Sequence, residues 1–517
     1  MRRFNFQICF LVFLLLSAVG LQAQTWQEVQ PGIDYRYYRF ESPKNDVFVT
    51  RMDRTTTTTI IDASIANGKI SQPGVTYNAE TIPSQVTRYD GAFGFWGRTT
   101  ARYRYKVVAA INGNGFSTAN GCPDSAMVMN GALIKRTFGS SGAENGGMGF
   151  LYKLGSSAPT PGYPYMGKDL YLPPDQTKNR ISFTDATWLQ YHKINDQPQS
   201  DRITLYTHHY GGKTPSTSGV TEIVVRTENA QPLRILPWSN YSRGTAVEIK
   251  KSSSGQTVIP FDCIVIVASG SCIDDVEGKI PTVGTEVRFS LETQDTSGLD
   301  WTNLYCGIGP MWGVIVRGGV KSSSTSTGFT TEVHPRTAVA FSDDYIYFVV
   351  VDGRSTRSSG MTLSALADFC MSQLSATDAV NNDGGGSSTM WVDGEVKNVP
   401  SDGSPRAVAN GLMMIQIQDK EVSTDFSTGQ TVYTNTPSSS LSMRTGPGMN
   451  FHAFQSFPHG TALTIVENSL KGIRAQDVSG SPGYWWKIQT AGGDQGWVCG
   501  YYLSSTPPSG IDDWNHY

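Results

Sequence analysis

The feature that most restricts the possible folds of this chain is a long series of short segments with strand character. The series runs from about residue 50 to residue 420. The segments are rich in β-branched and aromatic residues and are bounded by Gly, Pro, Asn or Ser, a pattern typical of strands joined by turns. Examples are TTTTTIIDASI, KVVAAINGNGF, DCIVIVAS and EVRFSLET. The segment RTAVAFSDDYIYFVVVDGR predicts a hairpin that turns at Ser342–Asp344. Much of the fold must therefore be β-sheet.

One segment interrupts the strands with a helical pattern. In MTLSALADFCMSQL, Thr362 is a candidate N-cap, and apolar residues from Leu363 to Leu374 recur near the helical period. After it, WVDGEV predicts a hairpin with a type I′ turn at Asp393–Gly394, and NGLMMIQIQ predicts a buried closing strand. The expected fold class is α+β, with a large β-rich domain that contains few helices.

The chain has 517 residues, too many for one compact core, so several domains are expected. We predict a large domain over residues 24–422 and a Ser/Thr-rich linker over 423–440. A small all-β barrel over 441–505 and a disordered tail over 506–517 would follow.

The N-terminus predicts export. Arg2 and Arg3 precede an apolar run, and Ala23 offers a small-residue cleavage site, so residues 1–23 read as a signal peptide. A membrane anchor is the alternative, but the apolar run is short for a span. We therefore expect a periplasmic or extracellular protein without membrane insertion. A net charge of −3 without basic runs gives no footprint for nucleic acid.

Six cysteines follow the predicted signal peptide. They allow 15 disulfide connectivities, and none has the spacing of a zinc site. We expect buried thiols that act as small apolar residues, with no more than one disulfide bridge among them. The cysteines are Cys122, Cys263, Cys272, Cys306, Cys370 and Cys499.

The stretch NNDGGGSSTMWVDGEV is the most distinctive of the chain. Consecutive glycines from Gly384 to Gly386 let the backbone approach a ligand and form an anion-binding nest, and Ser387, Ser388 and Thr389 add hydroxyl donors. Asp383 would repel an anion, so it suits a ligand that combines an anion with a centre needing a base, a nucleophile or a cation. A glycine-rich tight turn without a ligand is the alternative.

Several motifs in order resemble the phosphodiester glycosidase family. They are HPRTAVAF, VVVDGRS, SGMTLSALADF, DAVNNDGGGSSTMWVDGEVKN and PSDGSPRAVANGL, with AAINGNGF upstream, over roughly residues 50 to 420. Asn382 stands where the family usually has Leu, and GIGPMWG replaces a richer Gly-Gly-Pro stretch. The resemblance implies hydrolysis of a sugar-1-phosphodiester, such as one of N-acetylglucosamine, to a free sugar and a phosphomonoester.

The resemblance also implies roles for individual residues. Asp383 and Asp352 are the carboxylates of the matched motifs, able to activate water or stabilise an oxocarbenium-like centre. Arg336 and Arg406 offer guanidinium forks for phosphate oxygens, and Arg336 is counted with the catalytic group. The substrate-binding candidates are Asn112, Asn114, Gly384, Gly385, Gly386, Ser387, Ser388, Thr389, Arg406 and His334.

Each role has a structural alternative. Asp352-Gly353 could be only a turn, and Arg336 could be a structural ion-pair arginine. Asn112 to Gly115 could be a plain turn with left-handed asparagines. His334 and the pair His208-His209 are expected to be surface or hydrogen-bonded histidines. No cofactor is required, although Asp383 beside a phosphate could hold Ca²⁺ or Mg²⁺.

The C-terminal segment resembles the bacterial Src homology 3 domain. The motifs are LSMRTGPG, FPHGTALTIVE, WWKIQ and GWVCGYYL, and the resemblance implies attachment to peptidoglycan or another glycan. The aromatic residues Trp485, Trp486, Trp497 and Tyr501 could stack on sugars or form the barrel core. The competing functions for the whole chain are a non-catalytic glycan-binding wall protein and a wall peptidase or amidase.

Overall fold

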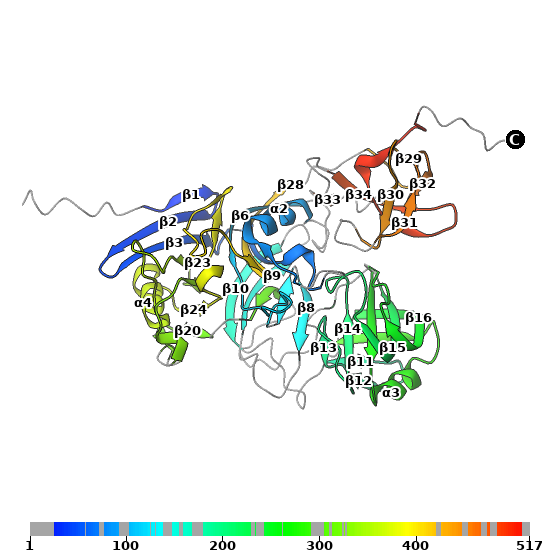
Figure 1. Cartoon of the computed structure of the whole chain (residues 1–517), viewed down its shortest axis with the longest axis horizontal. Coiled ribbons are helices and arrows are strands. Elements are labelled where there is room, and N and C mark those ends of the chain that lie inside the picture. The colour runs from blue at the N-terminus through cyan, green and yellow to red at the C-terminus, as the bar shows by residue number, and fades with distance from the viewer. Residues whose placement is uncertain are drawn as a thin grey trace, which may run out of the picture.

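The computed structural model describes most of the chain as a set of β-sheets with few helices (Figure 1). The described residues are 25–56, 58–71, 77–92, 103–124, 126–129, 131–137, 147–154, 159–167, 179–228, 233, 242–260, 262–290, 304–309, 313–322, 325, 328–419, 425–446, 453–466, 473–475 and 483–508. The predicted signal peptide and most of the predicted tail lie outside them. Across the described ranges, no helix is both long and apolar enough to cross a membrane.

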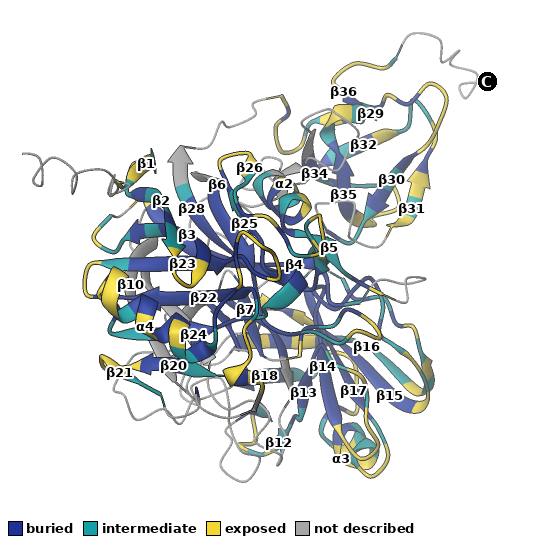
Figure 2. Ribbon diagram, turned by 60° about the vertical axis from the view of Figure 1, so that its left-hand side comes forward, coloured by how far each residue is buried: buried dark blue, intermediate teal, exposed yellow. Residues whose placement is uncertain are grey.

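An eight-stranded sheet in the described part of the chain carries the segment with the most distinctive motifs. Its central strands β22 and β23 are buried along nearly their whole length, so both faces are covered (Figure 2). The strands, in sheet order, are β1 (Gln27–Gln30), β2 (Ile33–Glu41), β3 (Lys44–Asp53), β23 (Tyr345–Val351), β22 (Arg336–Phe341), β24 (Asp378–Asn381), β20 (Val314–Arg317) and β21 (Val320–Lys321).

Helix α4 (Leu363–Leu374) covers one face of this sheet. Leu366 and Phe369 of α4 pack with Val349 and Val351 of β23. The alternate residues of β23, Phe348 and Val350, belong to the core on the other face. This alternation follows from the period of two along a strand.

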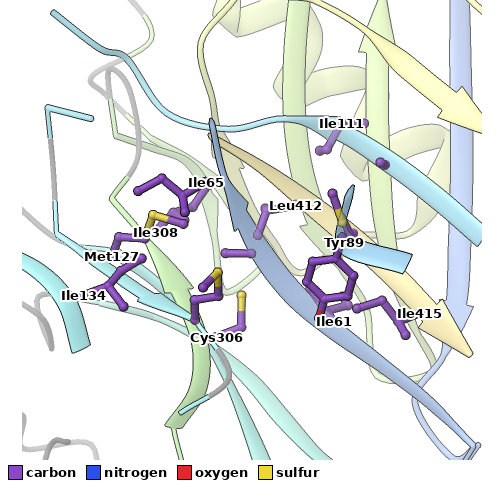
Figure 3. Packing of buried hydrophobic residues seen from close by; sticks show 14 of the residues in the cluster. Ile61, Ile65, Tyr89, Ile111, Met127, Ile134, Cys306, Ile308, Leu412 and Ile415 are labelled. Carbon is purple, nitrogen blue, oxygen red and sulfur yellow. The ribbon is translucent and has the colours of Figure 1, made fainter. Parts of the chain in front are cut away.

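A five-stranded sheet packs against that other face, counted over the described residues. Figure 3 shows part of the shared core, including Ile61, Ile111, Leu412 and Ile415. Helix α2 (Ile82–Ala92) adds Tyr89 to it. The strands, in order, are β26 (Glu395–Val396), β25 (Met390–Val392), β6 (Tyr103–Asn112), β28 (Asn410–Asp419) and β4 (Thr59–Ile65), with β27 (Ala407–Val408) and β5 (Glu80–Thr81) pairing beside them.

A thirteen-stranded sheet within the described ranges forms the middle of the chain, with α3 (Cys272–Lys279) near its far end (Figure 1). In order, its strands are β10 (Pro159–Gly167), β9 (Gly147–Leu154), β19 (Leu304–Ile308), β7 (Met127–Met129), β8 (Ala132–Thr137), β13 (Lys193–Ile194), β14 (Ile203–Tyr206), β17 (Cys263–Ala268), β15 (Ser216–Thr227), β16 (Ser242–Gly255), β18 (Glu286–Ser290), β11 (Arg180–Ser182) and β12 (Trp188–Gln190).

The C-terminal segment forms a separate antiparallel sheet with its own core, and β33 lies against α2. Trp485, Trp486 and Trp497 are at most 2% exposed and form its interior, whereas Tyr501 is 57% exposed. The strands are β29 (Thr431–Thr434), β30 (Leu441–Arg444), β31 (Ala453–Phe457), β32 (Ala462–Ile465), β33 (Ile473–Ala475), β34 (Gly483–Gln489), β35 (Gln495–Cys499) and β36 (Leu503–Ser504).

Several local predictions are confirmed. Strands β22 and β23 form the expected hairpin across Ser342–Asp344. The Thr362 hydroxyl accepts a hydrogen bond from the Ala365 amide and caps α4. Asp393 and Gly394 both have positive φ, 44° and 96°, as a type I′ turn requires. The fold class, a β-rich α+β protein with few helices, is confirmed as well.

Other parts differ from the expectation. Strand β29 lies inside the predicted linker 423–440 and pairs with β32 and β36, and Phe426 is buried in the C-terminal core. The Ser/Thr-rich composition concealed this strand, because only two of its four residues, Val432 and Thr434, are buried in this small sheet. The six cysteines after the predicted signal peptide are free thiols, and four of them are buried, in agreement with the expected small apolar role.

Candidate functional site

The candidate site lies where the eight-stranded and five-stranded sheets meet. Arg336, the first residue of β22, pairs with Val351, the last residue of β23, and Asn381 at the end of β24 pairs with Ala338. The chain then crosses to the five-stranded sheet, where Met390 of β25 pairs with β6. The glycine-rich loop is therefore the connection between the two sheets, and three strand ends surround it.

A pocket of about 150 Å³ opens at this connection. A cavity of about this volume holds a molecule the size of benzene, so the pocket has room for one small group and not for a polymer. It is lined by Phe329, Arg336, Arg354, Asn381, Asp383, Gly384, Gly385, Gly386 and Arg406. Three guanidinium groups thus face one carboxylate, so the lining has a net positive charge.

The three glycines make room for three arginine-bearing segments. A Cβ on Gly384 would lie 2.7 Å from the Pro335 carbonyl oxygen, directly before Arg336. On Gly385, at φ +62°, it would lie 3.1 Å from Nη2 of Arg354. A Cβ on Gly386 would lie 2.1 Å from Nη2 of Arg406. Any side chain in this loop would displace part of the pocket wall.

The loop's amides are less available to a ligand than the sequence predicts. The Gly384 amide donates to the Asp383 carboxylate at 2.9 Å, and the Gly385 amide donates to the Pro335 carbonyl at 2.9 Å. Among the described residues, the Gly386 amide has no acceptor. An anion in the pocket would therefore meet guanidinium groups chiefly, with at most one of these amides.

Asp383 is the carboxylate of the pocket. Burial raises its pKa, while the Ser387 hydroxyl, the Gly384 amide and the charge of Arg406 lower it. Its backbone is fixed on both sides: the amide donates to the Gly113 carbonyl at 3.0 Å, and the carbonyl accepts from Asn112 at 2.7 Å. A carboxylate held in this way faces the pocket in a set position.

Arg336 is buried, with 1% of its surface exposed, yet it ends in the pocket. Its Nε donates to the Met361 carbonyl at 2.9 Å and its Nη2 to the Glu332 carbonyl at 2.6 Å. Within the described residues it makes no ion pair with a carboxylate, so the structural ion-pair alternative is not supported. Burial lowers its pKa to about 10. A buried guanidinium with only carbonyl partners favours an anion beside it.

Arg406 forms the opposite wall. Its Nε and Nη2 bind Oδ2 of Asp402 at 2.8 and 2.7 Å, and its Nη1 lies 3.4 Å from the Ser387 hydroxyl. Asp402 thus orients Arg406 through an exposed ion pair, and it offsets the charge of this one arginine.

Arg354 is a pocket residue that the sequence analysis missed. It follows Asp352 and Gly353 directly after β23, its side chain is exposed, and its Nη2 lies 3.3 Å from Nδ1 of His334. The signal was present, because Arg354 stands inside the motif VVVDGRS. Only the register of β22 against β23 brings it to the glycine loop.

Asp352 faces away from the pocket. Its carboxylate accepts from the Val399 amide at 3.0 Å and from the Asn398 amide group at 3.0 Å. Burial raises its pKa to about 6, while those two hydrogen bonds lower it. Asp352 is not among the lining residues, and it fixes the segment that leads to Asp402 and Arg406. Its predicted catalytic role stays a prediction.

The predicted asparagines form a support under the loop. Asn112 is fully buried; its Oδ1 accepts from the Thr337 hydroxyl at 2.8 Å and from the Thr389 amide at 3.1 Å. Asn114 is bonded to Asn410, whose Nδ2 donates to Asn114 Oδ1 at 2.6 Å. Neither asparagine lines the pocket, although both were predicted to bind substrate.

The remaining candidates lie around the loop. Ser388 and Thr389 are buried, with their hydroxyls near Thr337 and the Ser387 carbonyl. His334 stacks on Phe329 at 4.8 Å between ring centroids, and its Nε2 lies 2.8 Å from a Glu332 oxygen. The pair His208 and His209 is buried, which rules out the surface alternative and leaves the hydrogen-bonded one, and burial lowers the pKa of His209 to about 3.

The described residues give little support for metal or thiol chemistry at this pocket. The described ranges contain no group of three or more His, Cys, Asp or Glu side chains placed to hold a metal ion. The predicted cation at Asp383 stays a prediction. Cys370 is buried on α4, and burial raises its pKa to about 12. A thiol nucleophile needs a depressed pKa, so this cysteine does not fit a thiol peptidase.

Comparisons with known proteins point to the same segment. Residues 261–415 match the family model of phosphodiester glycosidases. Over 80 residues, or 15% of its length, the chain is 42% identical to the SPbeta prophage-derived uncharacterized protein YomE of Bacillus subtilis. This stretch covers only 12% of YomE.

Two solved structures share the fold. A hypothetical protein from Synechocystis has a TM-score of 0.52 at 16% identity, over 77% of this chain and 64% of its own. A protein from Burkholderia pseudomallei, described as exported, has a TM-score of 0.51 at 18% identity, over 72% of this chain and 74% of its own. The lining residues, from Phe329 to Arg406, all lie within the matched family segment. The part of the chain that builds the pocket thus matches the phosphodiester glycosidase family.

Proposed function

We propose that this protein hydrolyses a sugar-1-phosphodiester to the free sugar and a phosphomonoester. The observation that carries the proposal is the glycine loop, in which each of three glycines adjoins an arginine-bearing segment beside one carboxylate. Guanidinium forks match the oxygens of a phosphodiester. The family match over residues 261–415 supports a glycosidase acting on such a substrate.

The residues divide the work between binding and chemistry. Arg336 and Arg406, on opposite sides of the loop, hold the phosphate oxygens and offset the charge that grows on the leaving phosphate. Asp383 serves the anomeric carbon, as a nucleophile or as the base for a water molecule. Water supplies the hydroxyl of the free sugar, and the phosphate leaves with the electron pair of the glycosidic bond. A phosphomonoester leaves readily, so a strong general acid is less necessary than for an alcohol.

Turnover in ¹⁸O-labelled water tests the proposal. The substrate is N-acetylglucosamine-1-phosphate esterified with methanol, and the products are resolved by mass spectrometry. Label in the sugar is expected, because the glycosidic C–O bond breaks. Label in methyl phosphate would instead indicate phosphodiesterase chemistry. Binding of the substrate without any turnover would favour the alternative of a non-catalytic glycan-binding protein.

Export and wall attachment belong to the same proposal. The signal-peptide pattern of residues 1–23 supports export, and N-terminal sequencing of secreted protein should then begin at Gln24. The C-terminal sheet is proposed to bind peptidoglycan or another glycan. Since the three tryptophans are interior, Tyr501 is the one of the four predicted aromatic residues that is left for stacking. Tyr501→Ala should weaken sedimentation with purified peptidoglycan; unchanged binding would contradict this role.

A further inference from the structure

Arg354 carries a charge that the proposed reaction does not use. Its guanidinium lies at the pocket rim over Gly385, and its side chain is exposed. Within the part of the chain that the structure describes, it makes no ion pair with a carboxylate. Asp402 offsets Arg406, but nothing equivalent is found beside Arg354.

The chain holds Arg354 in place at some cost. Its φ is 60°, in the left-handed region where a non-glycine residue is uncommon, and its amide donates to the Ser359 carbonyl at 3.2 Å. Since arginine is always a donor, Nδ1 of His334 accepts from Arg354, which leaves Nε2 of His334 to donate to Glu332. A residue held in an unfavourable conformation by such contacts points to a function.

The positive charges of Arg354 and Arg336 also repel each other. The positive charge of Arg354 adds to the effect of burial in lowering the pKa of Arg336. Two like charges at one pocket favour the binding of negative charge between or beside them. A phosphodiester carries a single negative charge at neutral pH, which Arg336 in the interior can match. Asp383 adds a second negative charge, and it interacts with Arg406, which lowers the pKa of that carboxyl. The exposed guanidinium of Arg354 makes no ion pair with a carboxylate of the described residues, so it remains available to a further anion.

We propose that Arg354 binds a second anionic group, carried by the alcohol that is esterified to the sugar-1-phosphate. The pocket of about 150 Å³ is too small for the whole substrate, so part of the substrate extends past the rim, where Arg354 is exposed, and we assign the alcohol to that side. The protein therefore selects phosphodiesters whose alcohol bears a further phosphate or carboxylate. This inference rests on the proposed function and specifies its substrate class.

Matched substrates test the selectivity. N-acetylglucosamine-1-phosphate is esterified with methanol, with 2-phosphoethanol or with 3-hydroxypropionate, and kcat/KM is measured for each at low and at high salt. The 2-phosphoethyl ester should exceed the methyl ester by about tenfold in the wild type, as one charge-assisted contact allows. High salt should reduce this ratio. The carboxylate ester distinguishes a need for phosphate from a need for charge.

The variants decide which residue is responsible. Arg354→Gln should bring the ratio to within about twofold of unity, since the fork and its charge are removed, and Arg354→Lys should restore part of it. Arg357→Gln is the matched control: it removes the same charge three residues away, where Arg357 binds Asp46 outside the pocket. It should keep the wild-type ratio.

Three outcomes would overturn the inference: an unchanged ratio in Arg354→Gln, an equal fall for both esters, or the same loss in Arg357→Gln. Calorimetric binding of the esters separates this test from the proposed function. If no ester is hydrolysed, the proposed function fails. The affinity ratio then still decides on Arg354, and equal affinities would count against it.

Discussion

Asp352 and Asp383 are both largely buried carboxylates that follow a strand, but only Asp383 lines the pocket. Asp352 follows β23 and Asp383 follows β24, and burial raises the pKa of both carboxylates. Asp352 is covered by the Val399 amide and Asn398, whereas Asp383 faces a pocket lined by arginines. A raised pKa therefore does not identify the functional carboxylate here. The surroundings separate them, because Asp352 is engaged by donors of the protein and does not line the pocket, whereas Asp383 does.

The largest expected effect is the loss of turnover in Asp383→Asn. The amide keeps the shape but cannot act as a base or nucleophile, so kcat should fall by at least ~10²-fold. Substrate affinity should persist or improve, because the repulsion between carboxylate and phosphate disappears. Single-turnover kinetics and calorimetric binding measure the two separately, with thermal unfolding as the folding control. Near-wild-type turnover would remove Asp383 from the chemistry and return attention to Asp352.

Arg336→Lys should weaken binding by about tenfold, the effect of losing one charge-assisted hydrogen bond. An ammonium group cannot replace a fork that binds the Met361 and Glu332 carbonyls and still reaches the pocket. The measurement is the dissociation constant for a sugar-1-phosphodiester. Arg39→Lys is a suitable comparison, since Arg39 binds Glu41 and Asp46 outside the pocket. Equal losses in both variants would mean that Arg336 acts on stability alone.

Gly386→Ala should reduce kcat/KM by about fivefold. The new Cβ would lie 2.1 Å from Nη2 of Arg406 and 2.2 Å from Oδ2 of Asp402, so that ion pair must move. Because Arg406 is partly exposed and can shift to make room, the overpacking should cost on the order of 1 kcal/mol of binding free energy. Gly278→Ala, where a Cβ would meet nothing within 4 Å, is the control. Unchanged kinetics in Gly386→Ala would show that the position of Arg406 does not matter.

Asp352→Asn should have the smallest effect on turnover, within about threefold, because the side chain acts at a distance from the substrate. Its effect should appear in stability against pH. The folded pKa of about 6 lies above the unfolded value of about 3.9. The folded protein therefore holds the proton more tightly, and the stability contribution present below about pH 4 is lost as pH rises through about 6.

In Asp352→Asn this group no longer titrates. The difference in unfolding free energy between the wild type and the variant should therefore change by on the order of 3 kcal/mol between pH 4 and pH 7. Urea unfolding across that pH range measures it. A parallel pair of curves would contradict the raised pKa. A loss of turnover as large as that of Asp383→Asn would erase the distinction between the two aspartates.

The sequence alone predicted the local elements well. The β22–β23 hairpin, helix α4 with its Thr362 cap and the type I′ turn at Asp393–Gly394 are all present. These features depend on residues close together in the chain, such as a period of apolar positions, a capping hydroxyl or a pair of turn residues. The hairpin partners and the cap need no knowledge of distant segments.

The sequence predicted some of the residues that line the pocket and missed others. Asp383, Arg336, Arg406 and the three glycines do line it, as the family motifs suggested. Arg354 was missed, and the predicted binding residues Asn112, Asn114, Ser388 and Thr389 do not line the pocket; Asn112 binds the loop from below instead. The strands β1 to β3 and the helices α2 and α3 were not foreseen either, because their patterns are weaker than the packing that stabilises them.

What the sequence by itself determined is therefore the set of elements and the chemical groups in their motifs. The tertiary structure alone decided which of these groups face the pocket. Asn112 and Asp383 are 271 residues apart, yet a single hydrogen bond of 2.7 Å between them fixes the loop. Side chains at strand ends take their direction from strand register and from such distant contacts, which no local pattern contains. That is why, of two aspartates in equally plausible motifs, Asp383 lines the pocket and Asp352 does not.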